Sequence, residues 1–290
     1  MASPGFEAAC GEIRGACGNP RRLGLLLAPR SPAERQQIRA AYRASFGEDL
    51  AATLQGTLVP ARQEDELCKL LYLWALDPAE RDAVVAREAV EGGGTTVAGY
   101  RALVEVFTRR KQDQLFFTKQ AYMAKFRRNL DQDMVTEPSH PYQRLLVALA
   151  ASRKSHHDEL SQHIAKCDAR RLHDAKNGGA GSVALKTNGG GEFEDALRAV
   201  VKCIYSPSKY YTKVMQTADS LLQRSMRCAA TDKRLVTRAI LGSDDVGIDE
   251  IRSVFKSCYG RNLADFIHES LPQSDYRDFL VAVARGSAAS

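Results

Sequence analysis

The chain lacks a hydrophobic run long enough to cross a bilayer. No apolar stretch approaches the ~20 residues that a membrane-spanning helix requires. The N-terminal stretch MASPGFEAACGEIRGACG has neither the basic segment nor the apolar segment of a secretory signal. From these two absences we expect a cytoplasmic protein whose contact with membranes, if it has any, is peripheral.

Cysteine motifs and strand patterns are missing as well. The seven cysteines are scattered and form no CxxC pair, which excludes a zinc ribbon and a thioredoxin-type redox site. No convincing alternation of polar and apolar residues predicts a strand. Proline lies mostly at the ends of segments rich in Ala, Leu, Arg, Glu and Lys, which favour helices. We therefore expect an all-α chain, and 290 residues suffice for a real hydrophobic core.

Helical patterns cover most of the sequence. The predicted helices are residues 4–16, 33–45, 65–76, 79–90, 99–108, 112–126, 141–153, 157–175, 192–204, 208–226, 232–240, 248–259, 262–269 and 275–284.

One pattern recurs three times, in residues 38–50, 118–130 and 251–263. Each copy has an aromatic residue, a second aromatic four positions later and a leucine four positions after that. This spacing predicts that all three side chains lie on one face of one helix. We expect the rings to be largely buried, namely Tyr42, Phe46, Tyr122, Phe126, Phe255 and Tyr259.

A second pattern begins an apolar helix four times, at Glu66, Pro141, Glu192 and Asp275. Three of these starts are carboxylates, which the unpaired amides at a helix N-terminus favour. The first pattern is therefore one copy short, and a glycine-rich stretch, 177–191, stands where that copy would lie. This stretch is either the remnant of a deleted repeat interior or a simple inter-domain linker. We favour the deletion, because a helix matching the end of a repeat follows directly.

Three repeat-junction segments and one closing-helix segment resemble those of the annexin family, with the first junctions resembling plant annexins. They are residues 73–83 (LWALDPAERDA), 145–149 (LLVAL), 205–211 (YSPSKYY) and 274–280 (SDYRDFL). The resemblance implies a curved disc of four helical repeats. Its implied boundaries are 5–78, 79–153, 154–206 and 207–286, with a shortened third repeat that contains the 177–191 linker.

The resemblance also implies calcium sites, each built from a GxGT loop and an acid about forty residues later. Calcium prefers six to eight hard oxygen ligands, which backbone carbonyls and a bidentate carboxylate can supply. Only the first and fourth repeats keep both parts, and both loops are degenerate. The implied metal-site residues are Ala16, Gly18 and Glu66 in the first repeat, and Ala230 and Asp275 in the fourth. We therefore expect calcium to bind weakly or not at all.

Two further metal candidates are weaker. The segment Gly92–Thr95 is a literal GxGT, but Pro141, which has no side-chain ligand, stands at its acid position. His156, His163 and Cys167 share one face of a predicted helix. They could hold zinc or copper, although such helical histidines are more often packed or solvent-facing.

Basic residues gather around predicted helix 112–126. The candidate lipid-binding cluster is Arg109, Arg110, Lys111, Arg127 and Arg128, accompanied by Lys119 and Lys125. Attraction to anionic lipid is the functional interpretation, and an ordinary solvated face is the alternative. We do not expect nucleic-acid binding, because Phe116, Tyr122 and Phe126 fit a buried stripe better than an exposed stacking surface.

Together these features favour a peripheral, annexin-type binder of acidic phospholipid with weak calcium dependence. A structural or protein-interaction module that has lost calcium and lipid binding is the alternative. No nucleophile–base or paired-acid arrangement indicates an enzyme.

Overall fold

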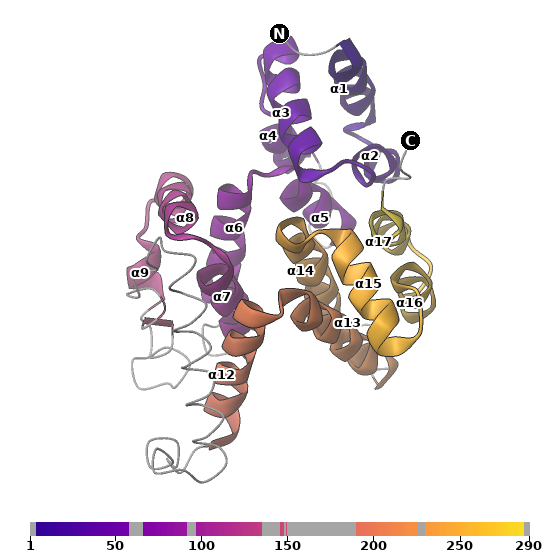
Figure 1. Cartoon of the computed structure of the whole chain (residues 1–290). Helices are drawn as coiled ribbons and strands as arrows, with labels where there is room; N and C mark the ends of the chain where they lie inside the picture. The colour runs from indigo at the N-terminus through magenta and orange to yellow at the C-terminus, as the bar shows by residue number, and fades with distance from the viewer. Residues whose placement is uncertain are drawn as a thin grey trace. The chain divides into compact units, whose positions relative to one another are not determined.

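The computed structural model describes residues 4–57, 66–91, 97–134, 146–147, 149, 190–224 and 230–286. Every regular element within these ranges is a helix (Figure 1). The predicted all-α class is therefore confirmed. No helix in the described ranges is long and apolar enough to cross a membrane.

The chain forms two compact units. Unit 1 consists of residues 1–81 and 206–290, and unit 2 consists of residues 82–205. Unit 1 thus combines the segments predicted as the first and fourth repeats. Helix α6 (Pro78–Glu91) passes through the boundary between the units.

The first half of unit 1 contains five helices, α1 (Pro4–Ala16), α2 (Pro20–Leu27), α3 (Pro32–Phe46), α4 (Leu50–Thr57) and α5 (Glu66–Ala75). Local sequence explains their starts. Helices α2 and α3 have proline in the first turn, where no backbone amide is needed. Ser31 and Glu34 form a reciprocal capping box at the start of α3.

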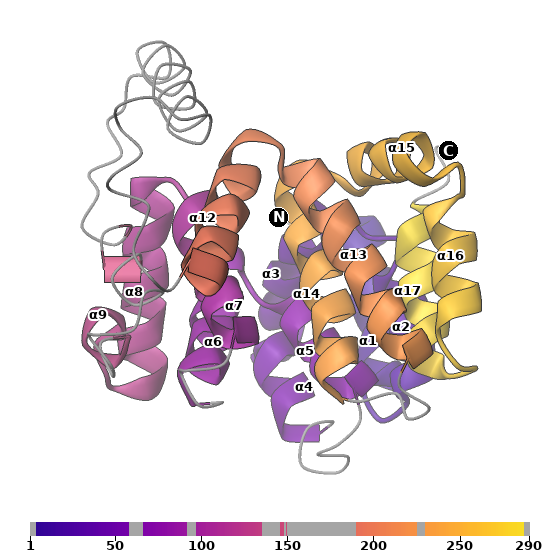
Figure 2. The ribbon, with the colours of Figure 1, turned by 90° about the horizontal axis from the view of Figure 1, so that it is seen from below.

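The second half of unit 1 also contains five helices, α13 (Pro207–Arg224), α14 (Ala230–Val246), α15 (Ile248–Tyr259), α16 (Leu263–Ser270) and α17 (Asp275–Arg285). Helices α13 and α14 lie side by side, as α16 and α17 do (Figure 1 and Figure 2). Helix α17 also packs on α2 and α5, so the two halves share one core.

Aromatic and charged groups join these halves. The ring of Trp74 in α5 meets Phe279 in α17 edge-on, with centroids 5.7 Å apart. The buried guanidinium of Arg35 lies over Trp74 and donates to Asp244 of α14 at 2.6 Å, and Arg81 pairs with the second oxygen of Asp244. Removing that carboxylate would leave two buried cations unpaired.

Unit 2 contains most of α6, together with α7 (Val97–Arg109), α8 (Gln112–Phe126), α9 (Leu130–Asp133) and α12 (Gly190–Tyr205). Its core includes Tyr100, Phe107, Tyr122 and Val200, and α12 packs on α7. Helix α12 begins at Gly190, so the predicted glycine-rich linker extends two residues too far. The rest of that linker and the interior of the third predicted repeat lie outside the described residues.

The aromatic pattern is real, but its predicted geometry is wrong. In all three copies the helix ends at or beside the second aromatic, and the leucine begins the next helix. The first ring of each copy is fully buried, whereas the second is half-buried: Phe46, Phe126 and Tyr259. Each pair of rings remains in contact, with centroids 4.8–5.1 Å apart.

Three helices were not predicted, namely α2, α4 and the four-residue α9. Helices α2 and α4 are eight residues each, and each contains a glycine, Gly24 or Gly56, which weakens a helical pattern. Gly24 favours close packing, because a Cβ there would lie 3.2 Å from Cδ2 of Phe279, which is tighter than an ordinary van der Waals contact.

Candidate calcium sites and exposed surfaces

The turn between α1 and α2 is the calcium loop that the resemblance implies for the first repeat. It is short and closed on itself. The amide of Asn19 donates to the carbonyl of Ala16 at 2.8 Å, and the Asn19 side chain accepts from the amide of Arg22 at 3.1 Å. Ala16 is fully buried, whereas Gly18 is exposed.

This geometry disfavours Ala16 as a metal ligand. A calcium loop presents carbonyl oxygens outward, but the Ala16 carbonyl already closes the turn. Gly18 does not adopt a positive φ, and a Cβ there would meet nothing within 4 Å. The turn therefore does not depend on a glycine at this position.

The predicted acid of the first repeat, Glu66, is the first residue of α5 and is partly exposed. Helix α5 packs on α2, which follows the loop. The acid thus begins one of two packed helices of unit 1, and the loop leads into the other. Residues 58–65, which precede Glu66, lie outside the described residues.

The predicted acid of the fourth repeat, Asp275, is the first residue of α17. The hydroxyl of Ser274 caps this helix by accepting from the amide of Arg277 at 3.2 Å. The Asp275 carboxylate is half-exposed and lies 3.6 Å from Nε of Arg21, which comes from α2. The proposed calcium ligand of the fourth repeat thus has a protein cation beside it.

The loop expected beside Asp275 is only partly described. Ala230 is the first residue of α14, so its backbone is helical and not part of an open loop. Cys228 and Ala229 lie outside the described residues, as do Gly92–Thr95 and the histidine-rich segment 156–173. Among the described residues, no group of three or more His, Cys, Asp or Glu side chains is placed to hold a metal ion.

Two of the five residues of the basic cluster near α8 are paired with carboxylates. Arg110 is buried and makes two hydrogen bonds to the carboxylate of Asp82. This placement disfavours Arg110 as a lipid ligand, because the carboxylate holds the guanidinium inside unit 2. Arg128 is exposed but pairs with Asp133 at 2.7 Å.

The other cations around α8 differ in exposure. Lys119 pairs with Asp131 at 2.8 Å, and Arg109 is half-buried. Lys111 and Arg127 are exposed and form no ion pair within the described residues. Of the five residues predicted to bind lipid, these two are the best placed to meet an anion.

Sequence reasoning missed an apolar surface on α8. Phe116, Phe117 and Met123 are 57%, 56% and 44% exposed, so assigning Phe116 to the buried stripe was wrong. At 100° per residue these side chains lie opposite Thr118 and Tyr122, the buried residues of the helix. The adjacent phenylalanines were a usable signal. Consecutive residues of a helix point 100° apart, so Phe116 and Phe117 could not both lie at the centre of one narrow buried stripe.

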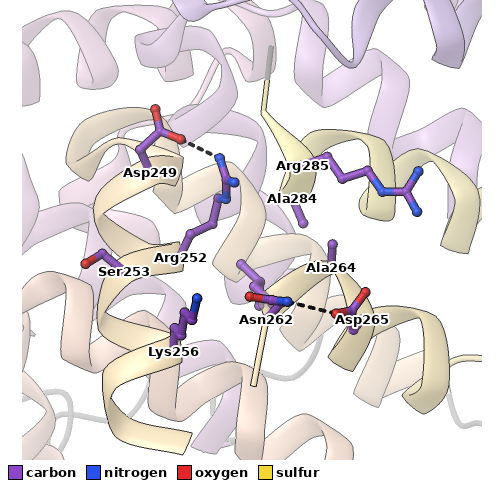
Figure 3. Close-up of a pocket in the computed structure, with 10 residues that line it drawn as sticks. Asp249, Arg252, Ser253, Lys256, Asn262, Ala264, Asp265, Ala284 and Arg285 are labelled. Atoms are coloured by element: carbon purple, nitrogen blue, oxygen red, sulfur yellow. Dashed lines mark hydrogen bonds and ion pairs between the residues drawn. The ribbon is translucent and has the colours of Figure 1, made fainter. Parts of the chain in front are cut away.

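A polar pocket of about 570 Å³ lies among α15, α16 and the end of α17. Its side chains largely satisfy one another: Arg252 pairs with Asp249 at 2.7 Å, and Asn262 donates to Asp265 at 3.0 Å (Figure 3). Lys256 stands beside them. Both cationic and anionic side chains line the pocket, so it favours neither a positively nor a negatively charged ligand.

Comparisons with known proteins extend over nearly the whole chain. No family model matches it. Annexin A4 of Mus musculus is 28% identical over 90% of this chain and 87% of its own length. Annexin-like protein RJ4 of Fragaria ananassa is 25% identical, covering 96% of this chain and 93% of its own.

Solved structures agree on the fold. Annexin III superimposes with a TM-score of 0.75 at 23% identity, covering 99% of this chain and 96% of that one. Calcium-bound annexin (Sm)1 gives 0.72 at 19% identity, with 98% and 92% coverage.

The fold is thus that of the annexins, a class of helical repeat proteins. The agreement in sequence confirms the resemblance to the annexin family, and plant annexins are among the relatives.

Proposed function

We propose that this annexin-like protein binds acidic phospholipid surfaces peripherally, on the cytoplasmic side, with weak assistance from calcium. The observation that carries the proposal is the similarity to annexins along nearly the full chain. Several structural neighbours, annexin (Sm)1 among them, are described as calcium-bound. Glu66 and Asp275 support a residual role for calcium, because each places a carboxylate at the start of the last helix of its half of unit 1.

The closed loop supports weak calcium binding in the first repeat. Since the Ala16 carbonyl accepts the Asn19 amide, calcium would rely on Glu66, the remaining loop carbonyls and water. Few protein ligands and a loop that must rearrange predict an affinity no better than ~10⁻⁴–10⁻³ M.

In the fourth repeat, Arg21 competes with calcium for Asp275. Both side chains of this ion pair are exposed to solvent, so the pair contributes little to stability. It nevertheless supplies a positive charge at the place where calcium would have to bind. We therefore propose that direct contacts with cationic side chains contribute more to lipid binding than calcium does.

Sedimentation with vesicles tests the proposal. The whole chain is mixed with phosphatidylserine vesicles or with phosphatidylcholine vesicles, in chelator and in a calcium series up to millimolar concentrations. We expect binding to phosphatidylserine only, in chelator as well as in calcium, with a modest increase near 0.1–1 mM calcium. Binding in chelator should fall as salt rises, because exposed charges are screened. Absence from the pellet under every condition would refute the proposal.

A second candidate function is protein interaction, and the exposed side chains of α8 favour it. Phe116, Phe117 and Met123 form an apolar outer face on a helix whose inner face is already buried. Contiguous exposed apolar side chains are typical of interaction sites. This candidate predicts that the chain fails to bind either vesicle, and that Phe116→Ser with Phe117→Ser leaves the vesicle result unchanged.

A further inference from the structure

The outer face of α2 joins two arginines and a leucine. Arg21 is 69% exposed at its side chain, Arg22 is exposed, and Leu25 is 61% exposed. At 100° per residue, Leu25 projects between the two arginines, one turn further along the helix. We call these three residues the α2 outer face.

The core does not require this face to be apolar. The inner side of α2 already buries Pro20, Leu23, Gly24 and Leu27. Gly24 allows the ring of Phe279 in α17 to approach closely, and α2 lies beside α17 (Figure 1). The helix is therefore firmly seated, and its outer residues are held in place without being needed for packing.

The charges around the face favour an anionic partner. Helix α2 carries no acidic residue, and the Arg22 side chain forms no ion pair within the described residues. Asp275 is the carboxylate beside Arg21, at 3.6 Å and half-exposed. Such a contact is weak enough in water for a phosphate to replace it.

We propose that the α2 outer face is a calcium-independent contact for an anionic phospholipid bilayer. Guanidinium groups suit phosphate because they donate two parallel hydrogen bonds. Leu25, between the two arginines, would enter the region just below the headgroups. The inference rests on the proposed membrane function and names the surface that performs it: arginines stand next to the closed turn where the resemblance implies a calcium loop.

A fluorescence reporter tests the position of the contact. The chain has one tryptophan, Trp74, which is buried and gives a constant background. In chelator, Leu25→Trp should shift its emission to the blue on adding phosphatidylserine vesicles. Phe116→Trp on α8 should not shift. A shift at residue 116 with none at residue 25 would place the membrane contact on α8 and overturn the inference.

A charge-reversal pair tests the energetics. Arg21→Glu with Arg22→Glu should weaken binding to phosphatidylserine vesicles in chelator by at least ~10-fold. The matched control is Lys209→Glu with Lys213→Glu on α13, an equal charge change at two exposed lysines of unit 1. Arg21→Lys with Arg22→Lys should restore most of the binding, because it keeps the charge. Inorganic phosphate at the same ionic strength as the buffer salt should not release the chain.

The outcomes separate the two proposals. If the wild-type chain does not sediment at all, the proposed membrane function fails. If the wild type sediments and the α2 reversal binds as well as the α13 reversal, only the α2 inference fails. Unchanged thermal unfolding of both variants would exclude misfolding as the cause of any loss.

Discussion

The same helix-to-helix turn occurs in both units, with a different residue at its left-handed position. In unit 1 the turns after Phe46 and Tyr259 use Gly47 and Gly260, with φ of 71° and 68°. In unit 2 the turn after Phe126 uses Arg127, with φ of 56°. In each turn, this residue's amide donates to the carbonyl four positions earlier at 2.8–2.9 Å.

This difference shows what determines the turn. A residue with a side chain is disfavoured in the left-handed conformation by roughly 1–2 kcal/mol, yet the geometry of unit 2 matches that of unit 1. The buried features common to all copies are the first aromatic before the turn and the leucine after it, such as Tyr122 and Leu130. We infer that burial of these two side chains, one before and one after the turn, determines its conformation. Glycine only lowers the conformational cost of the left-handed residue.

Truncating the first ring should have the largest effect. Tyr122→Ala in unit 2 and Phe255→Ala in unit 1 should each lower the free energy of unfolding by about 3–5 kcal/mol, because both rings are fully buried. Urea denaturation measures the change. Tyr259→Ala is the control, since its ring is half-buried and should cost only about 1–2 kcal/mol. Equal losses at all three positions would contradict the role given to the first ring.

Exchanging the left-handed residues should have a smaller effect of opposite sign in the two units. Gly47→Ala and Gly260→Ala should each destabilise by about 1–2 kcal/mol. A Cβ at either glycine meets no atom within 4 Å, so the change isolates backbone strain. Arg127→Gly should stabilise by less than ~1 kcal/mol, because relief of strain is partly offset by a more flexible unfolded chain. A strong loss on Arg127→Gly would instead show that the arginine side chain holds the turn.

The turn in unit 2 has an additional acid-sensitive contact. Asp133 accepts from Arg128 and from the hydroxyl of Tyr122 at 2.8 Å. The hydrogen bond from Arg128, followed by that from Tyr122, lowers the pKa of Asp133 below its ordinary value, against the opposing effect of burial. Because the folded pKa is below the unfolded value of about 3.9, the contact stabilises fully above that pH and is lost as pH falls through the folded pKa.

Thermal unfolding of Asp133→Asn measures this contact. The midpoint of the variant should lie below that of the wild type at pH 6, and the gap should close as the pH falls toward 3. Tyr122→Phe is the companion variant, because it removes one donor and keeps the ring. A gap that does not depend on pH would show that the carboxylate acts through packing and not through its charge.

Much of the fold could be predicted because long helices have a strong period. The aromatic spacing was found, but i, i+4 and i+8 fit one continuous helix as well as two helices joined by a turn. Gly47 and Gly260, each directly after the second aromatic, were the sequence signal for a helix end. Arg127 gives no such signal. The turn of unit 2 could therefore be inferred only by analogy with the two turns of unit 1 that follow the same aromatic pattern.

The candidate site was less predictable, because its decisive contacts join distant residues. The acids at helix starts, Glu66 and Asp275, follow from local chemistry. The partner of Arg110 is Asp82, in a different helix, and the partner of Asp275 is Arg21, at the other end of the chain. No periodicity in a single sequence reports such pairs. The turn at Ala16 is likewise closed by a backbone hydrogen bond from Asn19, and residue types alone do not determine which backbone groups pair.

The smallest effects should be those of substitutions on calcium affinity, which compare the two halves of unit 1. Titration calorimetry of the wild-type chain should give at best weak binding, in the ~10⁻⁴–10⁻³ M range. Glu66→Gln should weaken binding in the first repeat, because the amide loses the charge and the bidentate grip. Asp275→Asn should have less effect, since Arg21 already lies beside that carboxylate.

Arg21→Gln sharpens the comparison, because it removes the competing cation and leaves both acids in place. An exposed ion pair is worth at most about 1 kcal/mol, so calcium affinity should rise by no more than ~5-fold. The rise should vanish when Asp275→Asn is added, since the freed carboxylate is then gone. In the same variant, vesicle binding in chelator should fall, because Arg21 belongs to the α2 outer face. Micromolar calcium binding that survives Glu66→Gln combined with Asp275→Asn would show that the calcium ligands lie elsewhere in the chain.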